Sequence, residues 1–86
     1  MAVFQRRPVR VEAVRWLGDN FDDVHGFVDE GTLLTQGLTE PDLLLVQARD
    51  GTRLALWSGD WLLRDERGRL YSCHPELFER EYEAVA

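Results

Sequence analysis

The chain has no lysine, one cysteine and three prolines among its 86 residues. The single thiol, Cys73, excludes an internal disulfide and a cysteine-rich zinc site, which fits a reducing compartment. No segment approaches the ~20 consecutive apolar residues that a membrane helix requires. The first eight residues carry charge and no apolar targeting segment. We therefore expect a cytoplasmic protein with no membrane partner.

Positive charge is scarce, because ten arginines stand against 16 acidic residues and the formal net charge is −6. Such a surface repels phosphate backbones and argues against nucleic-acid binding. The exception would be a local patch formed by four N-terminal arginines, Arg6, Arg7, Arg10 and Arg15. Such a patch would bind DNA or RNA with an affinity that falls steeply with salt.

The length leaves room for one domain, residues 1–86, since domains usually contain about 100–150 residues. A domain of this size buries a limited core and has modest stability. A possible homo-oligomer would add to that stability.

Residue patterns in the first half predict a strand, a helix and an irregular segment. Apolar residues alternate with charged ones over residues 9–16, and the alternation changes phase after Ala13. We expect either a bulge there or a strand end that is covered on both faces. A helix is expected from Phe21 to Glu30, with Asn20 as its N-cap. Residues 31–42 are expected to be irregular.

The second half predicts successive antiparallel strands and a closing helix. The turn signals are Asp50-Gly51, Ser58-Gly59-Asp60 and residues 65–68. The strands are expected over residues 43–48, 52–57, 61–64 and 69–73. Pro75 suits the first position of the last helix, whose apolar stripe would include Leu77, Phe78 and Tyr82. The sequence therefore predicts an α+β fold with one mostly antiparallel sheet of about five strands, in the order β-α-β-β-β-β-α.

Two polar sites contain residues that can carry chemistry. Cys73 and His74 could form a nucleophile and its base, but neighbours on a strand point to opposite faces, so Cys73 is interpreted as a buried apolar residue. Asp60 lies in a glycine-containing turn, where an aspartate usually bonds its own backbone. No phosphate-binding glycine loop and no Ser/His/Asp motif is present. We therefore expect a protein that is not an enzyme, with no cofactor and no metal site.

Aromatic residues give the strongest indication of a binding surface. Trp57 falls on the more exposed face of its strand, and Trp61 follows directly across the turn. Two indoles near one sheet edge could stack a base or anchor a protein interface. The alternative interpretation is that the helices cover them. The candidate binding residues are Trp57, Asp60, Trp61, Tyr71, Arg53 and Arg64.

Three segments resemble a family of small uncharacterised proteins of tailed bacteriophages and prophages, which has a Pro-Gly-Asp-Tyr/Trp turn. The segments are Arg7 to Trp16 with Gly18-Asp19-Asn20, Ser58 to Arg64, and Gly68 to Glu79 followed by Tyr82-Glu83. Ser58 and Ser72 stand where the family usually has proline. The resemblance implies a phage or prophage origin and a product of the host cell cytosol, with no assigned activity.

Together these observations favour a noncatalytic accessory protein that engages a host protein or sequesters a small signalling molecule. The contacts would come from a sheet edge and residues 31–42. One alternative is a nucleotide-type ligand at an oligomer interface, with Arg53 or Arg64 on the phosphate and a tryptophan on the base. A second alternative is a minor enzyme of unknown reaction that uses Asp60 or Cys73.

Overall fold

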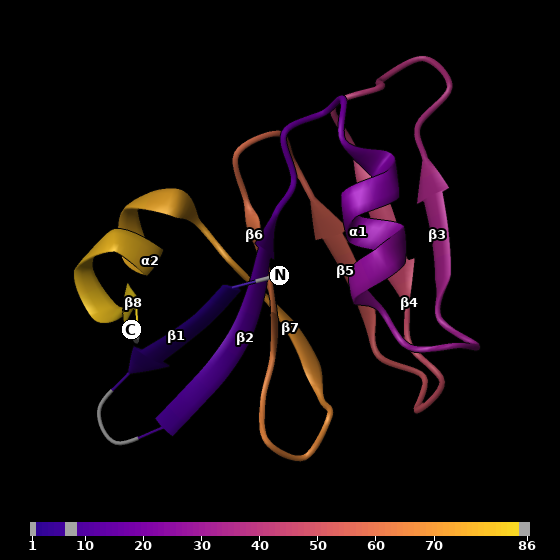
Figure 1. The fold of residues 1–86 in the computed structure, drawn as a ribbon. Coiled ribbons are helices and arrows are strands. Elements are labelled where there is room, and N and C mark those ends of the chain that lie inside the picture. The colour runs from indigo at the N-terminus through magenta and orange to yellow at the C-terminus, as the bar shows by residue number, and fades with distance from the viewer. Residues whose placement is uncertain (1, 7–8, 85–86) are drawn as a thin grey trace.

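The computed structural model describes residues 2–6 and 9–84, which form two helices and eight strands in two antiparallel sheets (Figure 1). The larger sheet has the spatial order β7-β6-β2-β1-β8 and comprises β1 (Ala2–Arg6), β2 (Val9–Arg15), β6 (Trp61–Arg64), β7 (Leu70–Cys73) and β8 (Glu83–Ala84). The smaller sheet has the order β3-β4-β5 and comprises β3 (Leu33–Gln36), β4 (Leu44–Gln47) and β5 (Arg53–Leu56). The helices are α1 (Phe21–Phe27) and α2 (Pro75–Glu81). The expected α+β class is confirmed, and the main sheet has five strands.

The element order differs from the expectation in three strands and in one connection. The sequence patterns did not predict β1, β3 or β8, and β3 lies within the segment expected to be irregular. The Ser58-Gly59-Asp60 turn does not close a hairpin, because β5 pairs with β4 whereas β6 pairs with β2. The turn therefore carries the chain from the smaller sheet into the larger one.

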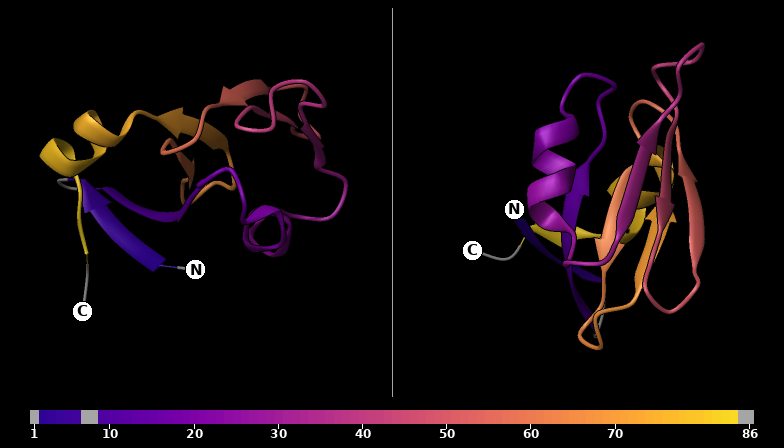
Figure 2. Two further views of the ribbon diagram at one scale, coloured as in Figure 1. Left: turned by 90° about the horizontal axis from the view of Figure 1, so that it is seen from above. Right: turned by 90° about the vertical axis from the view of Figure 1, so that its right-hand side faces the viewer.

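The larger sheet separates two apolar cores. The first core lies between this sheet, the smaller sheet and α1, and contains Trp16, Val24, Phe27, Leu44, Val46, Leu56, Leu62 and Leu70. The second core lies on the opposite face under α2 and contains Val11, Ala13, Leu63, Cys73 and Phe78. The two helices accordingly lie at opposite ends of the molecule, as Figure 2 shows from above.

The change of phase in β2 reflects these two cores. Val11 and Ala13 are buried in the second core, whereas Val14 and Trp16 contact the first core. The pairing of β2 with β1 and β6 continues through Ala13 without an extra residue. The interpretation of a strand end covered on both faces is therefore correct, and the bulge is absent.

The helices follow the expected stripes with local differences. α1 buries Val24 and Phe27 and ends at Phe27, three residues earlier than expected, because Val28 is already extended. Its N-cap residue makes no side-chain cap bond; Asn20 instead accepts a hydrogen bond from the Leu17 N–H and donates one to the Arg15 carbonyl. Neither helix in the described part of the chain has the length and apolar character needed to cross a membrane.

α2 begins at Pro75, as expected, and buries Phe78 against the second core. Tyr82, just beyond the helix, packs on the same core. Leu77 is 42% exposed and does not belong to the buried stripe.

Candidate binding surface

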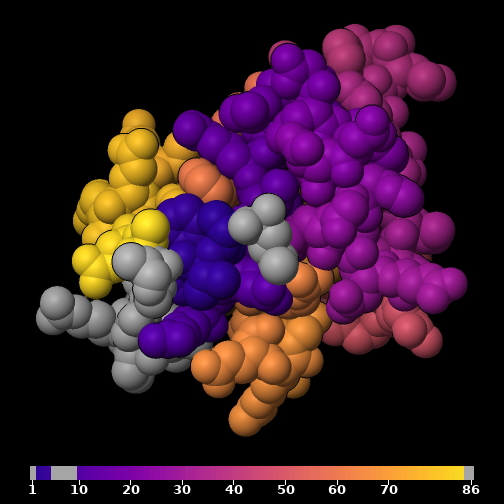
Figure 3. Space-filling view, viewed as in Figure 1, coloured from indigo at the N-terminus to yellow at the C-terminus, as the bar shows by residue number. Residues whose placement is uncertain are grey.

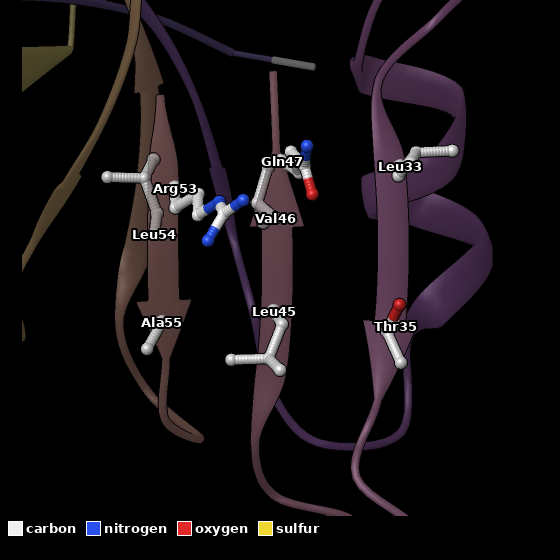
Figure 4. A pocket seen from close by; sticks show the side chains of 8 residues that line it. All are labelled: Leu33, Thr35, Leu45, Val46, Gln47, Arg53, Leu54 and Ala55. Atoms are coloured by element: carbon white, nitrogen blue, oxygen red, sulfur yellow. The ribbon is translucent and has the colours of Figure 1, made fainter. Parts of the chain in front are cut away.

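The smaller sheet has one face in the first core and one exposed face. Residues on β3, β4 and β5 alternate strictly between the two sides, so every second side chain points away from α1. We call this exposed side the outer face, and its six residues are Leu33, Thr35, Leu45, Gln47, Arg53 and Ala55. They border a shallow hollow of about 510 Å³ (Figure 4).

Cross-strand pairing arranges the outer face in two rows. Leu33 lies opposite Gln47, which lies opposite Arg53; Thr35 lies opposite Leu45, which lies opposite Ala55. The first row is mainly polar and the second mainly apolar. In Figure 4 the Arg53 side chain extends from β5 toward β4.

The strands of the smaller sheet carry little charge compared with the rest of the protein. Its three strands have the sequences Leu-Leu-Thr-Gln, Leu-Leu-Val-Gln and Arg-Leu-Ala-Leu, so Arg53 carries the only charge on them. The whole chain has a net charge of −6. The outer face is therefore a surface of apolar and uncharged polar side chains with one cation, on an acidic protein.

Trp57 extends the outer face beyond the end of β5. It follows Arg53 and Ala55 on the same side of the strand and is 47% exposed, as the strand alternation predicted. The hydrogen bond from the Gly37 N–H to the Leu43 carbonyl, 2.9 Å long, continues the pairing of β3 with β4 at this end. Leu43 and Trp57 therefore occupy the next row of the same face.

Trp61 and Tyr71 do not lie on the outer face, because both pack against the second core. The Trp61 ring stacks on Phe78 with centroids 3.9 Å apart and meets Phe4 edge-on at 5.3 Å. Tyr71 is half-buried against the same second core. No ring contact joins Trp57 to Trp61 among the residues that the structure describes. The expected platform of two indoles does not form, because β1 and α2 cover Trp61.

Arg64 is held inside the fold, whereas Arg53 is exposed. The Arg64 guanidinium lies 4.4 Å from the centroid of the Phe27 ring and is 13% exposed. It donates hydrogen bonds to the Glu12 carboxylate at 2.9 and 3.0 Å and to the Phe27 carbonyl. These contacts join β2, β6 and the end of α1. Arg64 is therefore a structural residue, and Arg53 is the candidate for contact with an anion.

Asp60 is buried at the turn between the sheets. Its Oδ2 accepts a 2.9 Å hydrogen bond from the Trp57 N–H, and its Oδ1 lies 3.2 Å from Nδ1 of His74. Its backbone N–H donates to the Trp57 carbonyl. The expectation that Asp60 bonds its own turn is confirmed.

Cys73 and His74 do not face each other. The Cys73 side chain is buried in the second core, with Sγ 3.6 Å from the backbone carbonyl of His74. The His74 ring is 82% exposed and turns toward Asp60. The expected burial of Cys73 is confirmed.

The N-terminal arginines are the residues that a nucleic acid would contact. Arg7 and the side chain of Arg6 lie outside the described residues. Arg10 is exposed, whereas Arg15 donates a hydrogen bond from Nε to the Gly59 carbonyl and lies 5.7 Å from the centroid of Trp61. Arg15 is thus partly engaged in the fold.

The sequence patterns did not single out Leu33, Thr35 or Leu45, although residues 31–42, which include the first two, were expected to supply contacts. Residues 33–36 read Leu-Leu-Thr-Gln, in which apolar and polar residues do not alternate, and the flanking Gly31 and Gly37 favoured a loop. Comparison of the chain with protein-family models, curated proteins and solved structures gives no match.

Proposed function

We propose that the protein is a noncatalytic binding module that engages a partner protein through the outer face of the smaller sheet. The observation that carries this proposal is the exposure of Leu33 (61%), Leu45 (45%) and Trp57 (47%) on one side of a sheet whose only charge is Arg53. Neighbouring apolar side chains left in water are a common mark of a protein contact surface.

The chemistry of the outer face indicates what the partner would offer. Burying one leucine side chain contributes about 1.5–3 kcal/mol, so an apolar patch on the partner would supply most of the affinity. Arg53 would pair with a carboxylate at the edge of that patch. The acidic remainder of the protein would speed encounter with a partner whose surrounding surface is basic. In keeping with the phage or prophage resemblance, the partner in this proposal is a protein of the bacterial host cytosol.

Capture from a bacterial lysate tests this proposal with matched variants. Leu45→Asp places a charge in the centre of the outer face, and Leu77→Asp places one at a similarly exposed leucine on α2, at 45% and 42% exposure. Both variants should keep the native circular-dichroism spectrum. We expect mass spectrometry to identify a protein that the wild type and Leu77→Asp retain and Leu45→Asp loses. Capture that is the same for all three proteins would contradict the assignment, as would the absence of any protein specific to the wild type.

A small anionic ligand is the second candidate, because Arg53 borders a hollow of about 510 Å³, within the usual size range of ligand sites. A thermal-shift screen with nucleotides tests it, using Arg53→Gln as the control. A stabilisation that the variant loses would favour this candidate, and no shift with any nucleotide would exclude nucleotides.

A further inference from the structure

We propose that β3 pairs, strand to strand, with β3 of a second copy of this chain. The two smaller sheets would then join into one antiparallel sheet of six strands, with both outer faces on the same side. The inference stands on the free edge of β3. It extends the proposed function without depending on it.

The hydrogen-bond alternation shows which groups of β3 are free. Gly37 bonds to Leu43, so Thr35 and Leu33, at two-residue intervals, also direct their backbone groups toward β4. The N–H and C=O groups of Leu34 and Gln36 therefore point away from the sheet. β3 is the last strand of its sheet, and no strand pairs with its far side among the described residues (Figure 1).

The edge lacks three features that commonly block strand addition. Natural edge strands are protected by a charge, a proline or a bulge. The sequence of β3 is Leu-Leu-Thr-Gln and has none of these, and its register with β4 is regular over all four residues. The opposite edge of the smaller sheet differs, since β5 lies against β7. β3 is therefore the open edge of this sheet.

A second copy can pair with this edge in a twofold-symmetric register. In that register every free N–H and C=O group of Leu34 and Gln36 forms a hydrogen bond. If Thr35 lies on the axis opposite its own counterpart, Leu34 of each copy pairs with Gln36 of the other. Four hydrogen bonds then form, two for each pair. Pairs of threonines directly opposite each other are favourable on a sheet face.

Charge favours this edge as the place of contact. Two copies with a net charge of −6 repel each other, but β3 and its neighbour β4 carry no charged side chain. The nearest carboxylates along the chain, Glu30 and Glu40, lie beyond the two ends of β3. The paired residues themselves therefore carry no carboxylate, and Glu30 of each copy lies at the same end of the pairing as Glu40 of the other, outside the hydrogen-bonded residues.

The outer face of a single copy is small compared with a typical protein interface. Three strands of four residues make a flat area of about 14 by 13 Å, or about 200 Å², from the usual strand spacings. A specific protein interface covers roughly 800 Å² of each partner. Pairing through β3 doubles the platform, places Thr35 of both copies at its centre and puts the two Leu33 side chains on its central strands. The β3–β4 connection, whose Leu38 is fully exposed, projects beyond the end of these strands (Figure 3).

Charge substitutions at Thr35 test the pairing. Thr35 is exposed, so Thr35→Lys and Thr35→Glu should both fold, but each places two like charges opposite each other across the axis. By sedimentation velocity we expect the wild type to dimerise with a micromolar dissociation constant. Each variant should weaken the dimer at least tenfold. An equimolar mixture of the two variants should restore it as a mixed dimer, because the introduced ammonium and carboxylate then face each other across the axis. Gln47→Lys, on the same face but on β4, is the control and should dimerise like the wild type.

Any result other than those expected for the wild type, the Thr35 variants, their mixture and Gln47→Lys would contradict the inference. A wild type that is monomeric throughout the micromolar range would exclude the pairing, as would a dimer that both Thr35 variants retain. Loss of the dimer in both variants without recovery on mixing would place Thr35 off the axis. Loss of the dimer in Gln47→Lys would indicate stacking of the outer faces instead. None of these readouts uses a partner protein, so failure here is separate from failure of the lysate capture.

Discussion

The carboxylate of Asp60 joins the turn between the two sheets to the start of α2. Its Oδ2 accepts a hydrogen bond from the backbone N–H of Trp57, and its Oδ1 lies 3.2 Å from Nδ1 of His74. The carboxylate is buried, whereas the imidazole is 82% exposed. The hydrogen bond to Trp57 should therefore stabilise the fold more than the contact with His74, because solvent weakens the contact with the exposed imidazole.

This difference predicts the result of two substitutions. Asp60→Ala removes a charged acceptor from the part-buried N–H of Trp57 and should lower the free energy of unfolding by about 1.5–3 kcal/mol. His74→Ala should cost less than about 1 kcal/mol. Urea denaturation monitored by tryptophan fluorescence measures both. If both variants lost the same free energy of unfolding, the contact between Asp60 and His74 would account for the contribution of Asp60 to stability.

Arg64 should not tolerate lysine. Its guanidinium reaches both the Glu12 carboxylate and the Phe27 carbonyl, which one ammonium group cannot match in geometry. We expect Arg64→Lys to destabilise the fold by about 1–3 kcal/mol. The control is Arg67→Lys in the exposed β6–β7 turn, which should stay within about 0.5 kcal/mol of the wild type. A wild-type melting temperature for Arg64→Lys would contradict the role assigned to this residue.

Trp16 has a polar as well as an apolar role. It is fully buried, and its Nε1–H donates a 2.7 Å hydrogen bond to the Asp42 carbonyl before β4. Trp16→Phe should therefore cost about 1–3 kcal/mol through the lost bond and the space left behind. Trp57→Phe is the matched change at a half-exposed indole and should cost much less. Chemical denaturation of the two variants distinguishes these expectations.

The hairpin turn at Asp50 predicts a pH effect of defined sign. Hydrogen bonds from Thr52 to the carboxylate lower the pKa of Asp50 below the usual 3.8. A lowered pKa means that the group adds stability above the pKa of the unfolded chain and loses it as the pH falls through the folded value. NMR titration should give Asp50 a pKa below the usual 3.8. A pKa at or above that value would show that the turn does not favour the ionised form.

Self-association through β3 should respond to salt in a direction opposite to that of an ion-paired interface. Each copy has a net charge of −6, and the paired strands carry no ion pair. Salt screens the general repulsion between the copies, with a Debye length of about 10 Å at 0.1 M. Sedimentation at increasing ionic strength should therefore show tighter dimers. Dissociation by salt would indicate an interface held by charge.

Local signals predicted the parts of the fold that depend on neighbouring residues. Asp50-Gly51 marks the hairpin between β4 and β5, and Pro75 marks the first residue of α2. The alternation around Trp57 also placed it on the more exposed face of its strand, where it is 47% exposed. In each case the physical cause lies within a few residues, in turn chemistry, helix initiation or strand geometry.

The missed features depend on contacts between distant segments. The four residues of β3 become a strand by pairing with β4, and the intervening connection has no hairpin signal. Trp61 is covered by Phe4 of β1, a strand that the sequence patterns did not predict, and by Phe78 of α2. The candidate surface therefore moved from a pair of tryptophans to the outer face, because what covers a strand face is a property of the whole fold.

The larger sheet contributes side chains to both cores, so the two cores should unfold together. Val14 faces the first core and Ala13 the second, while Leu62 and Leu63 repeat this division on the neighbouring strand. Neither core can be exposed without disturbing the backbone of the other. The amide protons of these four residues should exchange with solvent at a common, slowest rate set by complete unfolding, and heating should give one calorimetric transition for both halves of the molecule.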